Sequence, residues 1–263
     1  MKNEVHTAAK NALKGGVMDA EIYDADIIEA FASQNKSIER YLDIKICDLI
    51  ALRPRDFYDS GSSWRNAAQK LHCQGWDQFR DDIVHYFTSD LKDHPFPAPN
   101  SHQELRIGFT GGAIYCKLGN HRAVAAKAWL ASNHGENALF KKAKCYYRNI
   151  CPPLKELMME CINEGHILKH AFVAYKNRSI REHGICNLIL VERNTSSCDL
   201  YSLDTRFDKL ELIEHSRCLI IRVTKSDLRS KCLRLDFKVI QPRLMQIMLN
   251  DSKAIEAFGF THN

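Results

Sequence analysis

The sequence predicts an α+β protein in which a mixed sheet with helices is followed by a β-rich module at the C-terminus. Three observations carry this prediction: short apolar runs that alternate with polar residues, helical runs between them, and a change after Gly165 to successive strand-like runs. We therefore expect an N-terminal helical segment over residues 1–39, a first domain over residues 40–165 and a basic, β-rich module over residues 166–263.

The N-terminal part of the chain contains one predicted helix and one predicted strand. Apolar residues within 18–31 recur at helical spacing among acidic residues, which is typical of an amphipathic helix. Within residues 40–50, apolar side chains alternate with Asp43 and Lys45, which predicts a half-buried strand that ends before Pro54.

Two helices and a connector are expected next. An apolar face that includes Trp64 predicts a helix over residues 62–73, and a second helix is expected over residues 77–91 with Asp77 as its cap. Three prolines within residues 94–100 remove hydrogen bonds that helices and sheets need, so this segment is expected to be extended.

The middle of the sequence predicts a hairpin that leads directly into a helix. Residues 105–110 and 113–118 are apolar enough for strands, and Gly111-Gly112 between them is a turn signal. Residues 120–133 are rich in alanine and predict a helix that Asn120 caps. Further downstream we expect strands over 139–147, 167–175, 185–191, 219–223 and 235–240, a helix from Pro152 to Cys161 and a final helix over 242–249.

The composition excludes several classes of protein. No apolar run approaches the ~20 residues that a membrane helix requires, so no membrane association is expected. The first residues lack the apolar core of a secretory signal, and a cytoplasmic location is expected. The ten cysteines are scattered singly, which indicates reduced thiols in the core rather than a disulfide framework. Nothing in the sequence sets the oligomeric state.

A phosphate-binding turn is predicted where the second hairpin strand enters the helix. Gly119 permits close approach, and a helix N-terminus directs backbone N–H groups and the positive end of its dipole at one spot. His121 and Arg122 add side-chain donors, and Arg122 has the planar fork that suits phosphate oxygens. On these residues alone, the alternative is that Asn120 merely caps the helix and Arg122 is a solvated surface residue.

Two motifs resemble the ParB/sulfiredoxin superfamily, and the resemblance covers residues 40–160. One is the first strand with its proline exit, Asp48-Leu49-Ile50-Ala51-Leu52-Arg53-Pro54, and the other is the turn and helix Leu118-Gly119-Asn120-His121-Arg122-Ala123-Val124-Ala125-Ala126. The resemblance implies a nucleotide-binding enzyme that hydrolyses or transfers a phosphoryl group, uses ATP or CTP with Mg²⁺, and acts on or near DNA.

The chain departs from the family's pattern in three features that bear on its function. Sulfiredoxins have a cysteine where this chain has Asn120, so reduction of sulfinic acid is not expected. Chromosome-partitioning members need a helix-turn-helix, whereas here one helix and then strands follow residue 150. The family's serine kinases have an acidic residue after the first-strand proline, matched by Asp56, but also an Asp where this chain has Leu118.

The resemblance implies roles for individual residues. It makes Asp56 and His121 catalytic, Asp56 and Asp59 metal ligands, and the following residues ligands of the phosphates: Arg53, Arg55, Gly119, Asn120, His121 and Arg122. For the two aspartates the alternative is a solvated loop. A stacking role for Tyr58 and Trp64 competes with a place for Trp64 in the core.

Two other functions stay open. A metal-dependent nuclease would hold a backbone phosphate at the same turn and use Asp56 with a metal to activate water. A non-enzymatic module would bind DNA or another partner, because one fold hosts many functions.

Residues 166–263 contain 16 Lys and Arg against 11 Asp and Glu and so carry the whole net charge of +5. DNA binding is therefore assigned to that module, with an ordinary solvated surface as the alternative.

Overall fold

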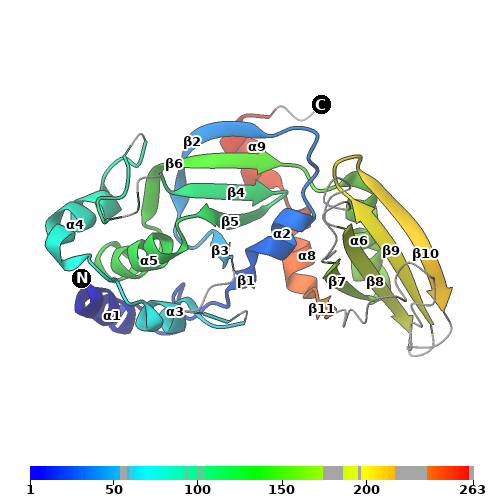
Figure 1. Cartoon of the computed structure of the whole chain (residues 1–263), viewed down its shortest axis with the longest axis horizontal. Coiled ribbons are helices and arrows are strands. Elements are labelled where there is room, and N and C mark those ends of the chain that lie inside the picture. Colours follow the sequence, from blue (N-terminus) through cyan, green and yellow to red (C-terminus); the bar gives the residue numbers. More distant parts are fainter. Residues whose placement is uncertain are drawn as a thin grey trace. The chain divides into compact units, whose positions relative to one another are not determined.

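The computed structural model divides the chain into two compact units, each built around its own sheet (Figure 1). It describes residues 1–53, 58–59, 61–92, 94–99, 101, 104–173, 186–194, 197–216 and 236–260. The first unit comprises Met1–Glu29, Ser37–Arg148 and Asp251–Asn263, and the second comprises Ala30–Lys36 and Asn149–Asn250. The chain thus passes between the units after residues 29, 36, 148 and 250, none of which lies near Gly165, and both units are discontinuous in sequence.

The first unit contains a six-stranded mixed sheet in the order β1-β3-β5-β4-β6-β2. Strands β1, β3 and β5 run parallel to one another, as do β4 and β6, whereas β4–β5 and β2–β6 are antiparallel. Its strands are β1 (Tyr23–Asp24), β2 (Ile38–Lys45), β3 (Leu49–Leu52), β4 (Arg106–Thr110), β5 (Ala113–Leu118) and β6 (Leu139–Arg148). Its helices are α1 (Lys2–Asn11), α2 (Ala25–Ala30), α3 (Trp64–Lys70), the 3₁₀ turn η1 (Asp77–Phe79), α4 (Arg80–Thr88), α5 (Asn120–His134) and α9 (Ser252–Phe258).

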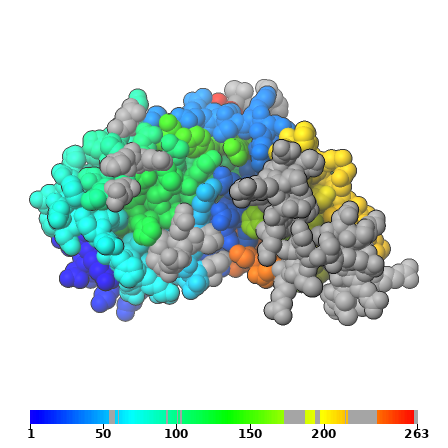
Figure 2. Space-filling view, in the orientation of Figure 1, coloured from blue at the N-terminus to red at the C-terminus, as the bar shows by residue number. Residues whose placement is uncertain are grey.

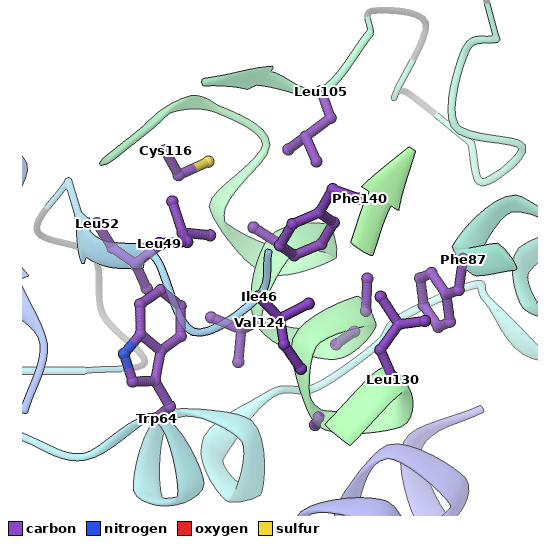
Figure 3. Close-up of a cluster of buried hydrophobic side chains, with 14 of the residues drawn as sticks. Ile46, Leu49, Leu52, Trp64, Phe87, Leu105, Cys116, Val124, Leu130 and Phe140 are labelled. Atoms are coloured by element: carbon purple, nitrogen blue, oxygen red, sulfur yellow. The ribbon is translucent and has the colours of Figure 1, made fainter. Parts of the chain in front are cut away.

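The core of this unit lies between one face of the sheet and α5. Helices α1, α3 and α5 contact one another. Figure 3 shows part of this core, with labelled side chains from α3, α4, α5, the strands β3, β5 and β6, and the segments beside β2 and β4. Trp64 of α3 is fully buried in this cluster, with Val124 of α5 and Leu49 of β3. Phe258 of α9 packs edge-on against Phe109 of β4. Trp64 is therefore a core residue, and a base-stacking role for it is excluded.

Elements with local signals form as predicted. The hairpin of β4 and β5, the helix α5 and the strand β6 match their expected positions within one or two residues. The predicted strand over residues 40–50 is instead two strands, β2 and β3, separated by a turn.

Two predictions in the N-terminal part are wrong. Most of residues 18–31 is not helical: Ile22 N–H donates to Ser62 O at 2.8 Å, and only the short α2 forms after β1. Met18 and Ile22 are buried by these long-range pairings rather than by a helical face. Asp77 does not cap α4, because its carboxylate lies 2.5 Å from the N-terminal ammonium of Met1.

The second unit contains a five-stranded sheet in the order β10-β9-β8-β7-β11, in which every pairing is antiparallel. The α+β class and the β-rich second half are thereby confirmed. Its elements are α6 (Pro152–Glu164), β7 (Ile167–Val173), β8 (Cys186–Asn194), β9 (Ser197–Asp204), β10 (Lys209–Ser216), β11 (Lys238–Val239) and α8 (Pro242–Leu249). The sequence did not predict β9 and β10 as strands, and the strand expected over 219–223 lies outside the described residues.

Two further predictions concern membranes and cysteines. No helix among the described residues is both long and apolar enough to cross a membrane. Seven cysteines have described side chains, and all seven are free thiols: Cys47, Cys73, Cys116, Cys145, Cys151, Cys161 and Cys198. Burial raises the pKa of the Cys116 thiol to about 12, so this thiol is protonated at neutral pH and acts as a small apolar core residue.

Candidate functional site

The carboxyl ends of three parallel strands meet at one edge of the first sheet. β1 ends at Asp24, β3 ends just before Arg53, and β5 ends just before Gly119. Ligands of open α/β sheets bind outside such carboxyl ends, where loops and helix N-termini converge. The predicted phosphate turn therefore lies at the edge of the sheet where a ligand site is expected on physical grounds.

Gly119 makes the turn from β5 into α5 and cannot be replaced without strain. Its φ is +98°, in the left-handed region that side chains disfavour, and a Cβ there would lie 2.1 Å from Nε of Arg122. The N–H of Ala123 donates to Gly119 O at 2.9 Å and closes the first turn of the 15-residue helix. The positive end of the α5 dipole consequently lies at Gly119.

Asn120 connects two strand ends and does not cap α5. Its Nδ2 donates to the backbone oxygen of Arg53 at 2.9 Å, and its side chain makes no capping hydrogen bond. The residue is 6% exposed. The prediction of a capping role is wrong, because the side chain is used to hold the end of β3 against the start of α5.

Arg122 lies in the interior instead of projecting toward solvent. It is 4% exposed, its Nη2 donates to Glu104 O at 2.9 Å, and its guanidinium lies 5.9 Å from the centre of the Phe96 ring. Burial lowers the pKa of Arg122 below its ordinary value. The alternative of a solvated surface arginine is wrong, and of residues 120–122 only His121 is exposed.

Charged side chains beside the turn form one network. Arg53, 35% exposed, pairs with Glu29 through Nη2, and its Nε lies 3.5 Å from Asp26 Oδ1. Lys117 Nζ lies 3.4 Å from the other oxygen of Glu29. Burial opposes the charge on Arg53, but the hydrogen bond to Glu29 and the negative charges of Glu29 and Asp26 together outweigh it, so the pKa of Arg53 lies above its ordinary value.

The predicted metal ligands are only partly described. Asp59 has a side chain that is 91% exposed, and its carboxylate lies 3.8 Å from Lys70 Nζ. Arg55 and Asp56 lie outside the described residues. Within the part of the chain that the structure describes, no group of three or more His, Cys, Asp or Glu residues could hold a metal ion.

Tyr58 is not available for stacking on a base. It is 3% exposed, and its hydroxyl donates to the backbone oxygen of Leu52. The bond fastens the segment after β3 to the strand that precedes it. Tyr58 is thus a structural residue at the carboxyl edge.

The sequence did not identify the paired residues Glu29 and Lys117 or the buried Lys127. Lys127 of α5 is 1% exposed, its Nζ donates to Leu49 O at 2.8 Å, and the same atom lies 3.8 Å from the centre of the Trp64 ring. Burial lowers its pKa to about 7. The signal that could have identified it is its position, since a lysine at residue 127 interrupts an otherwise alanine-rich helix that is buried on most sides.

Comparison of the chain with protein-family models, with curated proteins and with solved structures gave no match. The resemblance to the ParB/sulfiredoxin superfamily thus stays a prediction from the two sequence motifs.

Proposed function

We propose that the chain binds a nucleotide through its phosphates at the turn between β5 and α5 and hydrolyses or transfers a phosphoryl group there. The observation that carries the proposal is the convergence at one sheet edge of the positive end of α5, the close-approach residue Gly119 and the cations Arg53 and Lys117. A helix N-terminus with cationic side chains beside it favours anions, and nucleotide phosphates are anions of suitable charge.

The buried Arg122 contributes to this site indirectly. Its guanidinium lies over Gly119, so the side chain fixes the turn and adds positive charge next to it. The polar groups available to a phosphate from the open side include Arg53 and Lys117, which are partly exposed, and His121, which is exposed. Arg53 is then the principal phosphate contact, and Arg122 positions the turn.

Mg²⁺ would enter this site with the nucleotide. In phosphoryl transfer it neutralises charge on the phosphates and needs only one or two protein carboxylates besides water. Among the described residues, Asp59 has the exposure to serve as such a ligand, and the resemblance assigns the same task to Asp56. A nucleotide hydrolase and a metal-dependent nuclease would both use this arrangement. The two functions therefore differ in whether a nucleotide or a nucleic-acid backbone is cleaved.

The test is calorimetric titration of the full-length protein with ATP and CTP, with and without Mg²⁺. Arg53→Gln removes a charge-assisted contact of about 1.5–3 kcal/mol, so nucleotide affinity should fall roughly tenfold to a hundredfold. Arg80→Gln is the matched control, since Arg80 of α4 also pairs with two carboxylates, those of Glu4 and Asp81. Affinity of the Arg80 variant should equal that of the parent.

Turnover is measured separately as phosphate released from ATP or CTP and as cleavage of DNA. Asp59→Asn should lower whichever rate the parent shows and leave binding in the absence of Mg²⁺ unchanged. No saturable binding of either nucleotide at millimolar concentration, or equal affinity in the Arg53 and Arg80 variants, would refute the proposed site.

A further inference from the structure

One face of the first sheet carries tyrosines and basic residues in place of an apolar layer. The opposite face packs against α1, α3, α5 and α9. Six residues of β2, β4, β5 and β6 alternate outward from the core and define what we call the tyrosine–cation face: Tyr41, Arg106, Lys117, Lys144, Tyr146 and Arg148. All six are partly exposed.

The register of the strands gathers these residues into rows. Tyr41 of β2 lies opposite Lys144 of β6, which lies opposite Arg106 of β4. Tyr146, two residues along β6, lies opposite Gly108 of β4. The two tyrosines are thus diagonal neighbours on adjacent strands, a separation of about 7–8 Å between their backbones.

Each tyrosine ring already interacts with cations. Lys117 Nζ lies 5.2 Å from the centre of the Tyr146 ring, and Lys144 Nζ lies 5.6 Å from the centre of the Tyr41 ring. The pKa of Lys144 is raised well above its ordinary value, chiefly by its hydrogen bond with Glu39, so its charge is permanent. Aromatic rings flanked by cations are the arrangement on which nucleic-acid bases stack while the phosphates are neutralised.

Among the described residues, two of the cations on this face form no ion pair with a carboxylate. Lys144 pairs with Glu39 and Glu104, and Lys117 pairs with Glu29. For Arg106 and Arg148, no ion pair with a carboxylate is formed among the residues that the structure describes, and Nε of Arg106 is buried without a hydrogen-bond partner. Arg106 also lies directly opposite Lys144, and neighbouring cations on adjacent strands repel one another.

Gly108 leaves room on β4 for the ring of Tyr115. A Cβ at Gly108 would lie 2.3 Å from the ring of Tyr115 on β5, so the absence of a side chain lets that ring lie across the strand. Tyr146 lies opposite Gly108 on β4 and opposite Glu39 on β2. The part of the chain that holds β4, β5, α5 and β6, drawn in green, reaches the surface in Figure 2.

We propose that the tyrosine–cation face binds single-stranded nucleic acid, with bases stacked on Tyr146 and Tyr41 and phosphates held by Arg106 and Arg148. Stacking suits every base, so the binding is not specific for sequence. The face shares Lys117 with the proposed nucleotide site, but Tyr41, Tyr146, Arg106 and Arg148 have no role in that site. The proposal assigns nucleic-acid binding to residues 37–148 rather than to the basic module over 166–263.

The test is fluorescence anisotropy of the full-length protein with labelled single-stranded dT20 and U20, at several salt concentrations. Tyr146→Ala should weaken binding roughly 5- to 100-fold, and Tyr146→Phe, which keeps the stacking surface, should bind like the parent. Arg106→Gln should lower the slope of log affinity against log salt by about 0.7, the value for one phosphate contact to a single strand.

Arg40→Gln is the matched control. Arg40 is an exposed arginine of β2 that projects from the opposite face of the same sheet, so the change in net charge is identical. Binding to either oligonucleotide with this pattern supports the proposal. The proposal fails if neither oligonucleotide binds at low salt, if Tyr146→Phe weakens binding as much as Tyr146→Ala, or if Arg40→Gln changes the salt slope as much as Arg106→Gln. Circular dichroism at the assay temperature verifies that every variant is folded.

Discussion

Replacement of Lys127 by methionine should change the stability of the protein in a way that depends strongly on pH. The ammonium group of Lys127 is buried beneath Trp64 and donates to Leu49 O at 2.8 Å. Methionine fills a similar volume without a charge, so the substitution removes the cost of burying the charge but also leaves the Leu49 oxygen without its donor.

The magnitude follows from the pKa. Burial lowers the pKa of Lys127 from its ordinary value of 10.5 to about 7, and at 1.36 kcal/mol per pKa unit this corresponds to roughly 5 kcal/mol. Below pH 7 both the folded and the unfolded protein carry the charge, so the wild type bears the full cost. Between pH 7 and 10.5 the unfolded chain binds the additional proton, and stability of the wild type rises with pH until the cost is gone.

The free energy of unfolding of the methionine variant, relative to the wild type, should therefore fall by roughly 5 kcal/mol between pH 7 and 10.5. Loss of the hydrogen bond to Leu49 O lowers the stability of the variant by about 1–3 kcal/mol at every pH. We expect the variant to be the more stable protein at pH 6 and the less stable one near pH 10.5.

Urea unfolding followed by tryptophan fluorescence, at pH steps from 6 to 10.5, measures this difference. The parent and the variant share all other titrating groups, so their contributions cancel. Lys10→Met is the control, because Lys10 is exposed on α1 and its substitution should change stability by less than about 0.5 kcal/mol at any pH. A difference between Lys127→Met and the parent that stays constant within about 1 kcal/mol over this range would refute the reasoning.

Three further substitutions test individual contacts by thermal or urea unfolding. Gly119→Ala should lower the free energy of unfolding more than Gly165→Ala. Both glycines have a positive φ, which costs a side chain about 1–3 kcal/mol, but only at Gly119 would the new Cβ overlap another residue, Arg122. An equal loss of stability in the two variants would contradict this contact. Arg122→Gln should destabilise the protein by about 1–3 kcal/mol, because the backbone oxygen that Arg122 bonds loses its donor; an unchanged midpoint would show that Arg122 is not structural. Gly108→Ala should lower the free energy of unfolding by about 1–3 kcal/mol, because the new Cβ displaces the Tyr115 ring. A smaller loss of stability would mean that the ring moves aside easily.

The sequence predicted elements whose signals are local. The hairpin needs only two apolar runs and Gly111-Gly112, and α5 needs only its alanine-rich run after Gly119. The predicted helix over residues 18–31 failed because Met18 and Ile22 reach the core through pairing with a segment some 40 residues downstream, as in the bond from Ile22 N–H to Ser62 O. Helical spacing of apolar residues does not distinguish burial on one face of a helix from burial through such long-range pairing.

The site was predictable in position but not in the roles of its side chains. Gly119 and the start of α5 lie where the motif placed them. That Arg122 is buried, however, depends on Glu104 O and on the ring of Phe96, both of which precede it by more than 15 residues. The motif Gly119-Asn120-His121-Arg122 would be the same whether Arg122 were buried or exposed, so the sequence alone could not place its side chain.

The pairing of Arg53 with Glu29 leads to a last prediction, which rests on the proposed nucleotide site. No acidic residue occupies the first turn of α5, and the positive charge at the turn is offset instead by Glu29 of α2, which contacts both Arg53 and Lys117. A bound phosphate must compete with this carboxylate for the same cations. Ion pairs at partly exposed sites contribute only about 0–1 kcal/mol, so the exchange costs little.

Glu29→Gln should then tighten nucleotide binding, by about threefold to fivefold at low salt, because the competing charge is removed. The gain should shrink as salt increases, since screening weakens the competing pair. Glu4→Gln, which removes a partner of Arg80 far along the chain from the turn, should leave affinity unchanged. Weaker binding in the Glu29 variant would mean that the carboxylate holds Arg53 in the orientation that receives the phosphate, and that Glu29 supports the site instead of competing with its ligand.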